Sequence, residues 1–138
     1  MHVPDSPEAA ISKIISRSGY AVVHRPDPER NHLAYTVGLC LHPGRDHELA
    51  VTGQDSRTSG VVLNGTVEAL IRDGLAPAED MALSLLDQVP VRFRRVVDAS
   101  RITGPGGAPT VWQVLLPDRD GAYPDAPSYR QGFIQPLL

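Results

Sequence analysis

The chain has 138 residues, of which 41% are hydrophobic and 21% charged, and its formal net charge is -3. This length suits one domain, and the composition is ordinary for a globular protein. A negative net charge gives no broad attraction to nucleic acid or to an anionic membrane surface, so we expect neither as a partner. The single cysteine, Cys40, excludes an intramolecular disulfide and a zinc site built on paired cysteines.

The N-terminal residues are too polar for a signal peptide, and no apolar run approaches about eighteen residues. These two observations predict a cytoplasmic protein that does not enter a membrane.

The first part of the chain predicts a helix followed by a strand. Ser6-Pro7-Glu8 has the residue types that begin helices, and Gly19 supplies an end. Valine and tyrosine favour a strand over 20–25. Two prolines within 26–31 then predict a loop, because proline interrupts strand pairing.

The middle of the chain predicts two strands and the clearest helix. Strands are expected over 33–40 and 48–53, joined by a loop that contains Pro43-Gly44. The next segment, 56–73, has apolar residues at i, i+4, i+7 and i+8 from Leu63, which is typical of an amphipathic helix. Either Asp55 or Ser56 can cap this helix, and Gly74 can end it.

The last third of the chain is less regular. Residues 77–88 fit either a short helix or a loop that enters the core. Residues 90–97 alternate as a strand with one solvated face, which Arg92, Arg94 and Arg95 would form at a sheet edge unless they bind an anion. Residues 110–116 are almost wholly apolar, as expected of a central strand.

Together these elements predict the α+β class: a mainly antiparallel β-sheet with two or three helices packed on it. We expect a single compact domain over residues 1–138, with a flexible N-terminus at 1–5 and a loop-rich segment at 117–138.

Several short motifs occur in a distinctive order. The most specific is Ala34-Tyr35-Thr36-Val37-Gly38-Leu39, followed by Glu48-Leu49 and, toward the end, by Pro117-Asp118, Gly121, Pro124 and Gln135-Pro136. Over residues 10–136 the sequence resembles the DUF4262 family, a bacterial family of unknown function that is frequent in actinobacteria. The resemblance implies an architecture more than a chemistry, since the family has no assigned activity.

The chain departs from the family pattern at three positions. Typical members have a histidine where this chain has Asp46, so that His47 falls on the family's proline. They have tryptophan at the positions of Leu116 and Asp125. If these family positions form a site, an imidazole and two aromatic walls are replaced here, which implies a changed or lost activity.

Strand alternation suggests where a site would lie. It places Thr36 with other small residues on one face of the strand 33–40, and Glu48 with Thr52 on one face of the strand 48–53. Pairing of the two strands is expected to bring these three residues onto one small-residue surface. That surface either receives the helix 56–73 or forms a pocket with Glu48 at its mouth, as a general base or metal ligand.

Four residues are candidates for catalysis because they carry acid, imidazole or hydroxyl groups: Glu48, His47, Asp118 and Thr36. Four more are candidates for substrate contact: Tyr35, Thr52, Gln113 and Trp112. Each group has a structural alternative. Asp118 fits a turn, and Gln113 can form a hydrogen-bonded bridge to loop backbone. The two aromatic residues, Tyr35 and Trp112, can belong to the core.

Histidines and cysteine add weaker candidates. His42, Asp46, His47 and Glu48 cluster, but their spacing is not that of a known zinc site, so no metal and no cofactor are expected. His2, His24 and His32 have no partner that the sequence assigns. Cys40 is either a nucleophile with its pKa lowered by a loop histidine or a small buried apolar residue.

Three classes of function follow. We expect a small enzyme or tailoring protein that acts on a small molecule or peptide in a pocket on the sheet. The alternative is a non-catalytic binding or accessory module that recognises a peptide or partner protein, and the third is a structural subunit. The apolar tail 133–138 either packs back on the core or exchanges with a neighbour, which would make a homodimer.

Overall fold

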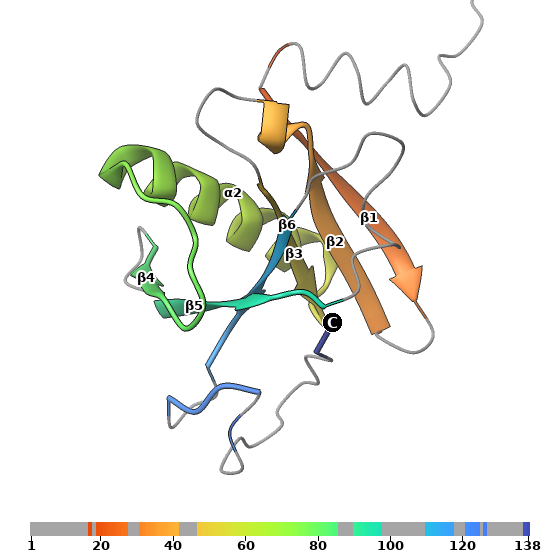
Figure 1. Cartoon of the computed structure of the whole chain (residues 1–138). Helices are drawn as coiled ribbons and strands as arrows, with labels where there is room; N and C mark the ends of the chain where they lie inside the picture. Colours follow the sequence, from red (N-terminus) through yellow and green to blue (C-terminus); the bar gives the residue numbers. More distant parts are fainter. Residues whose placement is uncertain are drawn as a thin grey trace, which may run out of the picture.

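A computed structural model (Figure 1) describes residues 17, 19–27, 31–41, 47–85, 90–97, 110–117, 121–124, 126 and 137–138. Within these residues the chain forms six strands, a short 3-10 helix and one α-helix. The helix predicted to start at Ser6 and the flexible N-terminus lie outside the described residues.

The six strands form one sheet with the order β1-β2-β3-β6-β5-β4. β3 and β6 pair in parallel, whereas the other neighbouring pairs are antiparallel. The strands are β1 (Ala21–Asp27), β2 (Asn31–Val37), β3 (His47–Thr52), β4 (Ala82–Ser84), β5 (Pro90–Arg95) and β6 (Thr110–Leu115).

The predicted fold class is therefore wrong: the sheet is mixed, and the described part of the chain holds one α-helix rather than two or three. The parallel pair forms because the chain leaves β3, passes through the helix and two further strands, and returns beside β3 as β6. Such a crossover is a property of the whole path, so the residue pattern within one strand does not show it.

The ambiguous segment 77–88 contains β4, where Leu83 is buried and faces Val91 of β5. Asp80 has a left-handed φ of 61°, which turns the chain just before this strand. A strand of three residues is too short to show a clear alternation.

The helix α2 (Ser56–Asp73) has the bounds that its apolar spacing predicts. Asp55 is the N-cap, and its side chain accepts a hydrogen bond of 2.7 Å from the Thr58 amide. Gly74 ends the helix in the left-handed conformation, with φ 63°. Within the described residues, no helix has the length and apolar character needed to cross a membrane.

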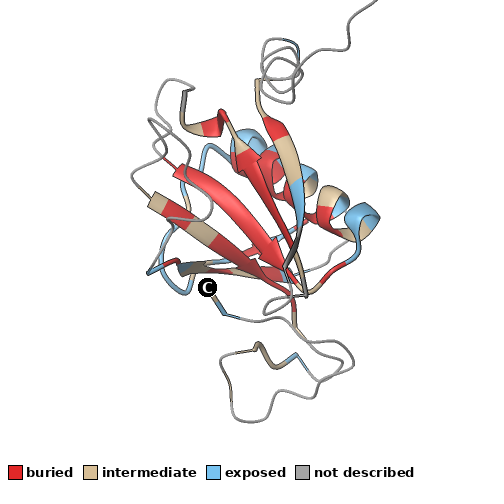
Figure 2. Cartoon of the chain, turned by 90° about the vertical axis from the view of Figure 1, so that its right-hand side faces the viewer, coloured by how far each residue is buried: buried red, intermediate tan, exposed pale blue. Residues whose placement is uncertain are grey.

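Two apolar clusters lie on the two faces of the sheet. The helix face, covered by α2, buries Ala34, Leu49, Val51, Phe93 and Val114 against Leu63, Val67 and Leu70 of the helix (Figure 1). The opposite face buries Leu33, Tyr35, Ala50, Val96 and Val111, with Leu138 packed against them. Burial on both faces is visible in Figure 2, where the inner strands are almost wholly buried while α2 keeps an exposed side. The inner strands are thus packed against apolar side chains on both faces of the sheet.

β1 continues through Pro26, where the sequence predicts a loop. Pro26 lies opposite His32 in the β1–β2 pair, at the edge of the sheet. An edge strand accepts proline because one side of its backbone has no neighbour to bond.

β5 is an inner strand between β6 and β4, so the prediction that its arginines line a sheet edge is wrong. Arg92 lies over the ring of Tyr123, with its guanidinium carbon 4.7 Å from the ring centre, and its Nε is 3.9 Å from an Asp80 oxygen. Arg92 therefore has internal partners in this fold.

Candidate functional site

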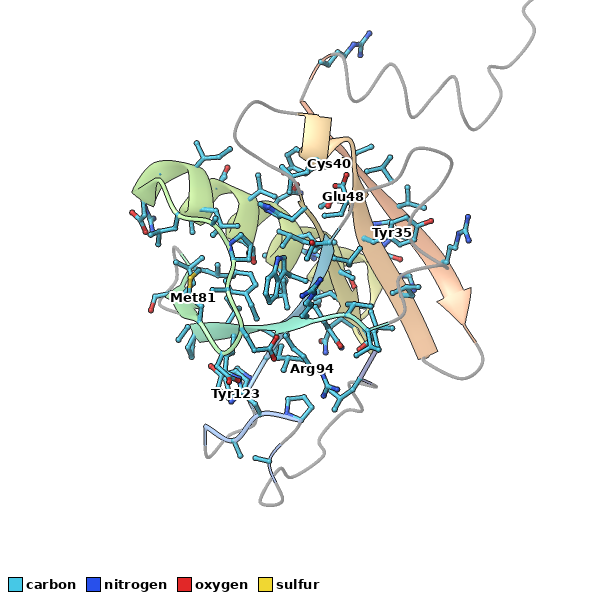
Figure 3. All side chains as sticks on the ribbon, in the orientation of Figure 1. Tyr35, Cys40, Glu48, Met81, Arg94 and Tyr123 are labelled. Atoms are coloured by element: carbon cyan, nitrogen blue, oxygen red, sulfur yellow. The ribbon has the colours of Figure 1, made fainter. Side chains whose placement is uncertain are left out.

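A buried carboxylate lies where β2 ends and the 3-10 helix η1 (Leu39–Leu41) begins. The carboxylate belongs to Glu48 on β3, which is only 5% exposed. Its Oε1 accepts hydrogen bonds from Thr36 Oγ1 at 2.8 Å and from the Leu39 amide at 3.1 Å. Its Oε2 accepts from the amides of Gly38 at 3.1 Å and Cys40 at 3.3 Å. We call this arrangement the Glu48 clasp, and Figure 3 shows Glu48 and Cys40 close together beside η1.

The local sequence explains why the clasp forms. Gly38 has φ 91°, a left-handed conformation that glycine adopts without strain, and the turn directs three successive amides at one carboxylate. Thr36 contributes a hydroxyl that donates to Glu48 and accepts from the Leu49 amide at 2.9 Å. The side chain of Glu48 thereby replaces strand pairing where β2 leaves the sheet.

This geometry limits what Glu48 can do chemically. Each carboxylate oxygen already accepts two hydrogen bonds, and the Thr36 hydroxyl is used both as donor and as acceptor. A general base must reach a substrate proton within hydrogen-bond distance. In this structure the predicted catalytic pair, Glu48 and Thr36, holds two segments of backbone together.

A second polar bridge crosses the opposite face of the sheet. Gln113 is fully buried on β6, and its Nε2 donates to Thr52 Oγ1 on β3 at 3.1 Å. Its Oε1 accepts a hydrogen bond of 2.9 Å from the Leu138 amide. Gln113 therefore joins the middle of the sheet to the last residue of the chain, as the bridge alternative predicts. Leu138 packs against the cluster of the opposite face, whereas 133–136 lie outside the described residues, so both alternatives for the tail stay predictions.

The predicted common surface of Thr36, Glu48 and Thr52 does not form. In the β2–β3 register Leu33 lies opposite Thr52 and Tyr35 opposite Ala50. Directly paired residues share a face, so Thr52 lies with Leu33 and Tyr35, whereas Thr36 alternates to the helix face. Thr36 still reaches Glu48, because the contact is made where β2 leaves the sheet.

The remaining candidates are also divided between the faces. His47 is buried, and by strand alternation it lies on the face opposite to Glu48. Trp112 packs against the cluster on the helix face and Tyr35 belongs to the cluster on the opposite face, so they do not line one site. Leu116, at a position where the resemblance implies tryptophan, is buried in the core of the helix face. Asp46, Asp118 and Asp125 lie outside the described residues.

The Cys40 thiol is not activated. Burial and a hydrogen bond to the Glu48 carboxylate raise the pKa of Cys40 from 9.0 to about 11, opposite to the lowering that a loop histidine would cause. Of the two histidines in that predicted loop, His42 lies outside the described residues and His47 is the first residue of β3.

Cys40 should therefore react slowly with alkylating reagents in the folded protein. With a pKa near 11 instead of 9, the thiolate fraction at pH 8 falls roughly a hundredfold. We expect alkylation by iodoacetamide at pH 8 to be at least about tenfold slower than for the same protein unfolded in urea. Equal rates in the two states would contradict the raised pKa.

Two histidines that the sequence left without partners meet across the β1–β2 pair. His24 Nδ1 and His32 Nε2 are 3.1 Å apart, and their ring centres are 5.3 Å apart. Partial burial and the neighbouring His32 lower the pKa of His24. Their separation of eight residues in the sequence was the available signal, and it is informative only once β1 and β2 are known to pair. No group of three His, Cys, Asp or Glu side chains that could hold a metal ion is found among the described residues.

Comparison with known families agrees with the resemblance in the motifs. Residues 14–130 of the 138 match the family described as "Domain of unknown function (DUF4262)". The chain belongs to this family. No curated protein and no solved structure shows significant similarity to it. Two of the motifs that carry the resemblance, Ala34–Leu39 and Glu48-Leu49, meet in the Glu48 clasp of this DUF4262 protein.

Proposed function

We propose that this DUF4262 protein is a non-catalytic binding module that recognises an extended peptide segment of a partner protein. The observation that carries the proposal is the edge strand β1, seven residues long, which has one neighbour among the described strands. An exposed sheet edge can accept an extended peptide as an additional strand, with backbone hydrogen bonds giving affinity.

The position of Pro26 indicates which backbone groups of β1 are available. Proline has no N–H, so in a paired strand its backbone nitrogen points away from the neighbour. Backbone orientation alternates along a strand, which gives Val22 and His24 the same outward direction. A peptide strand would therefore pair with the N–H and C=O groups of these two residues.

The side chains of β1 support the same surface. Val22 packs against the cluster of the helix face and Val23 against the cluster of the opposite face, yet both are only half-buried. A strand added beside β1 would complete their burial. Arg25, which is exposed and lies 5.8 Å from the centre of the Tyr35 ring, would favour an acidic residue in the peptide.

The enzyme interpretation stays a prediction and is the weaker candidate. It needs a carboxylate or imidazole free to move a proton, and Glu48 and Thr36 are engaged with each other and with backbone.

The proposal is tested by panning a phage-displayed random peptide library on the intact protein. We expect enriched peptides with alternating apolar residues, and we expect them to lose binding to Val22→Pro, which removes one outward N–H without touching the β1–β2 bonds. Val61→Ser, which alters an exposed apolar residue on α2, should leave binding unchanged. Failure to enrich any peptide, or equal binding to Val22→Pro, would overturn the proposal.

A further inference from the structure

We infer that His24 and His32 form a binding site for a divalent transition-metal ion of the Zn²⁺, Cu²⁺ or Ni²⁺ group on the helix-facing side of the β1–β2 hairpin. The inference rests on the distance between two ring nitrogens and on the paired strands that hold them, and it is independent of the peptide-binding proposal. Imidazole nitrogen is a preferred ligand of these three ions.

The nitrogens are spaced as two ligands of one ion would be. Zinc–nitrogen bonds are about 2.0–2.1 Å long, so two ligands at a tetrahedral angle lie about 3.3 Å apart and two at a right angle about 2.9 Å apart. The separation of His24 Nδ1 and His32 Nε2, 3.1 Å, falls between these values. The rings are tilted by 38° rather than stacked, and their nitrogens face each other as in a hydrogen bond, so each ring must turn for both lone pairs to point at one ion.

Without an ion, the same two nitrogens must share a proton. Two imidazole lone pairs that face each other at 3.1 Å repel, so one ring donates an N–H to the other. When a cation binds both of these nitrogens, the donor ring carries its proton on its other nitrogen instead, so that His24 Nε2 and His32 Nδ1 each hold one proton and both rings stay neutral. The site therefore requires a change of tautomer and a turn of the two rings, for which the exposed side chain of His24 has room.

The backbone and the local charge favour such an ion. β1 and β2 hold the two histidines on one face, because His24 lies opposite Ala34 and His32 opposite Pro26, two positions along the pair. The His32 carbonyl accepts a 2.8 Å hydrogen bond from Gly53, which places the start of α2 nearby. The exposed Asp55 carboxylate there is close enough to interact electrostatically with His32, and Arg57 partly offsets its charge. Water would complete the coordination sphere, because the described residues offer no third ligand.

The test is a calorimetric titration of ZnCl₂ into untagged, chelator-treated protein, with histidine ring signals followed by NMR. We expect one Zn²⁺ per chain, with shifts in the signals of His24 and His32. Removal of an outer-shell partner of a metal ligand typically weakens metal binding by about 10- to 100-fold. Removal of a ligand itself should therefore weaken binding by at least about tenfold. His24→Gln and His32→Gln should both show this loss, and an unchanged amide spectrum elsewhere would show that each variant is folded.

His2→Gln and His42→Gln are the matched controls, because they remove histidines of the N-terminus and of the 42–48 cluster. Both should bind Zn²⁺ as the unmodified protein does. The inference is overturned if the protein binds no Zn²⁺, if His24→Gln and His32→Gln bind normally, or if a control variant accounts for the binding.

Discussion

Replacement of Glu48 by glutamine should lower the free energy of unfolding by about 2–4 kcal/mol. Glutamine matches the shape of glutamate but keeps only one acceptor oxygen. Its NH₂ group would face two donors, whichever way it turns: the amides of Gly38 and Cys40, or the Thr36 hydroxyl and the Leu39 amide. Hydrogen bonds to a charged acceptor contribute about 1.5–3 kcal/mol each, and a buried donor left unpaired adds a further cost. Urea denaturation followed by circular dichroism measures the change.

Glu68→Gln provides the comparison, because Glu68 is exposed on α2 and its replacement should change stability by less than about 0.5 kcal/mol. The result also separates the two interpretations of Glu48. A residue kept for catalysis often lowers stability, so its removal leaves the protein equally or more stable. An unchanged or increased stability of Glu48→Gln would therefore contradict a structural clasp.

Replacement of Gln113 by leucine should lower the free energy of unfolding by about 2–3 kcal/mol and release the end of the chain. Leucine fills much of the same volume but can neither donate to Thr52 Oγ1 nor accept from the Leu138 amide. Leu138 also packs on the cluster of the opposite face, so its loss exposes apolar surface there. Hydrogen exchange of the Leu138 amide, followed by NMR, should become faster together with the loss of stability.

Thr52→Val is the matched control for this bridge. It removes the bond to Gln113 Nε2 but leaves the bond from Leu138, so it should destabilise the protein without accelerating exchange of the Leu138 amide. If Gln113→Leu leaves that amide as protected as before, Gln113 does not hold the end of the chain.

Local chemistry predicted most of the strands and the helix. The apolar spacing from Leu63 and the cap residues Asp55 and Gly74 act within one segment, and α2 has the expected bounds. The apolar run at 110–116 indicates a strand with neighbours on both sides, and β6 lies between β3 and β5. Signals of this kind depend on residues that are close in sequence. The path of the rest of the chain therefore does not change the element that they predict.

Relations between segments were less predictable. Alternation gives the two faces of a strand but not the register with its neighbour, and a shift by one residue exchanges the faces. Alternation within each strand therefore predicts one shared face for Thr36 and Thr52, but the register places them on opposite faces. The parallel pairing of β3 with β6, and the edge position of β4, depend in the same way on the path of the whole chain.

The candidate site was partly predictable. The proximity of Thr36 and Glu48 followed from two neighbouring strands, and the contact exists. The role of this contact was harder to infer, because the three amides that complete the clasp belong to the backbone of Gly38, Leu39 and Cys40. Every residue except proline has a backbone N–H, so the residue types do not show which amides act as donors. A glycine two residues after the threonine was the one available signal.

Hydrogen exchange of the amides of Gly38, Leu39 and Cys40 tests most directly that Glu48 is a structural acceptor. In the unmodified protein these amides should exchange about as slowly as those in the centre of β3, although they lie beyond the end of β2. In Glu48→Gln their protection should fall well before that of β3. Fast exchange of all three amides in the unmodified protein would contradict the clasp. Glu48 would then have a carboxylate that is free to act as an acid or base.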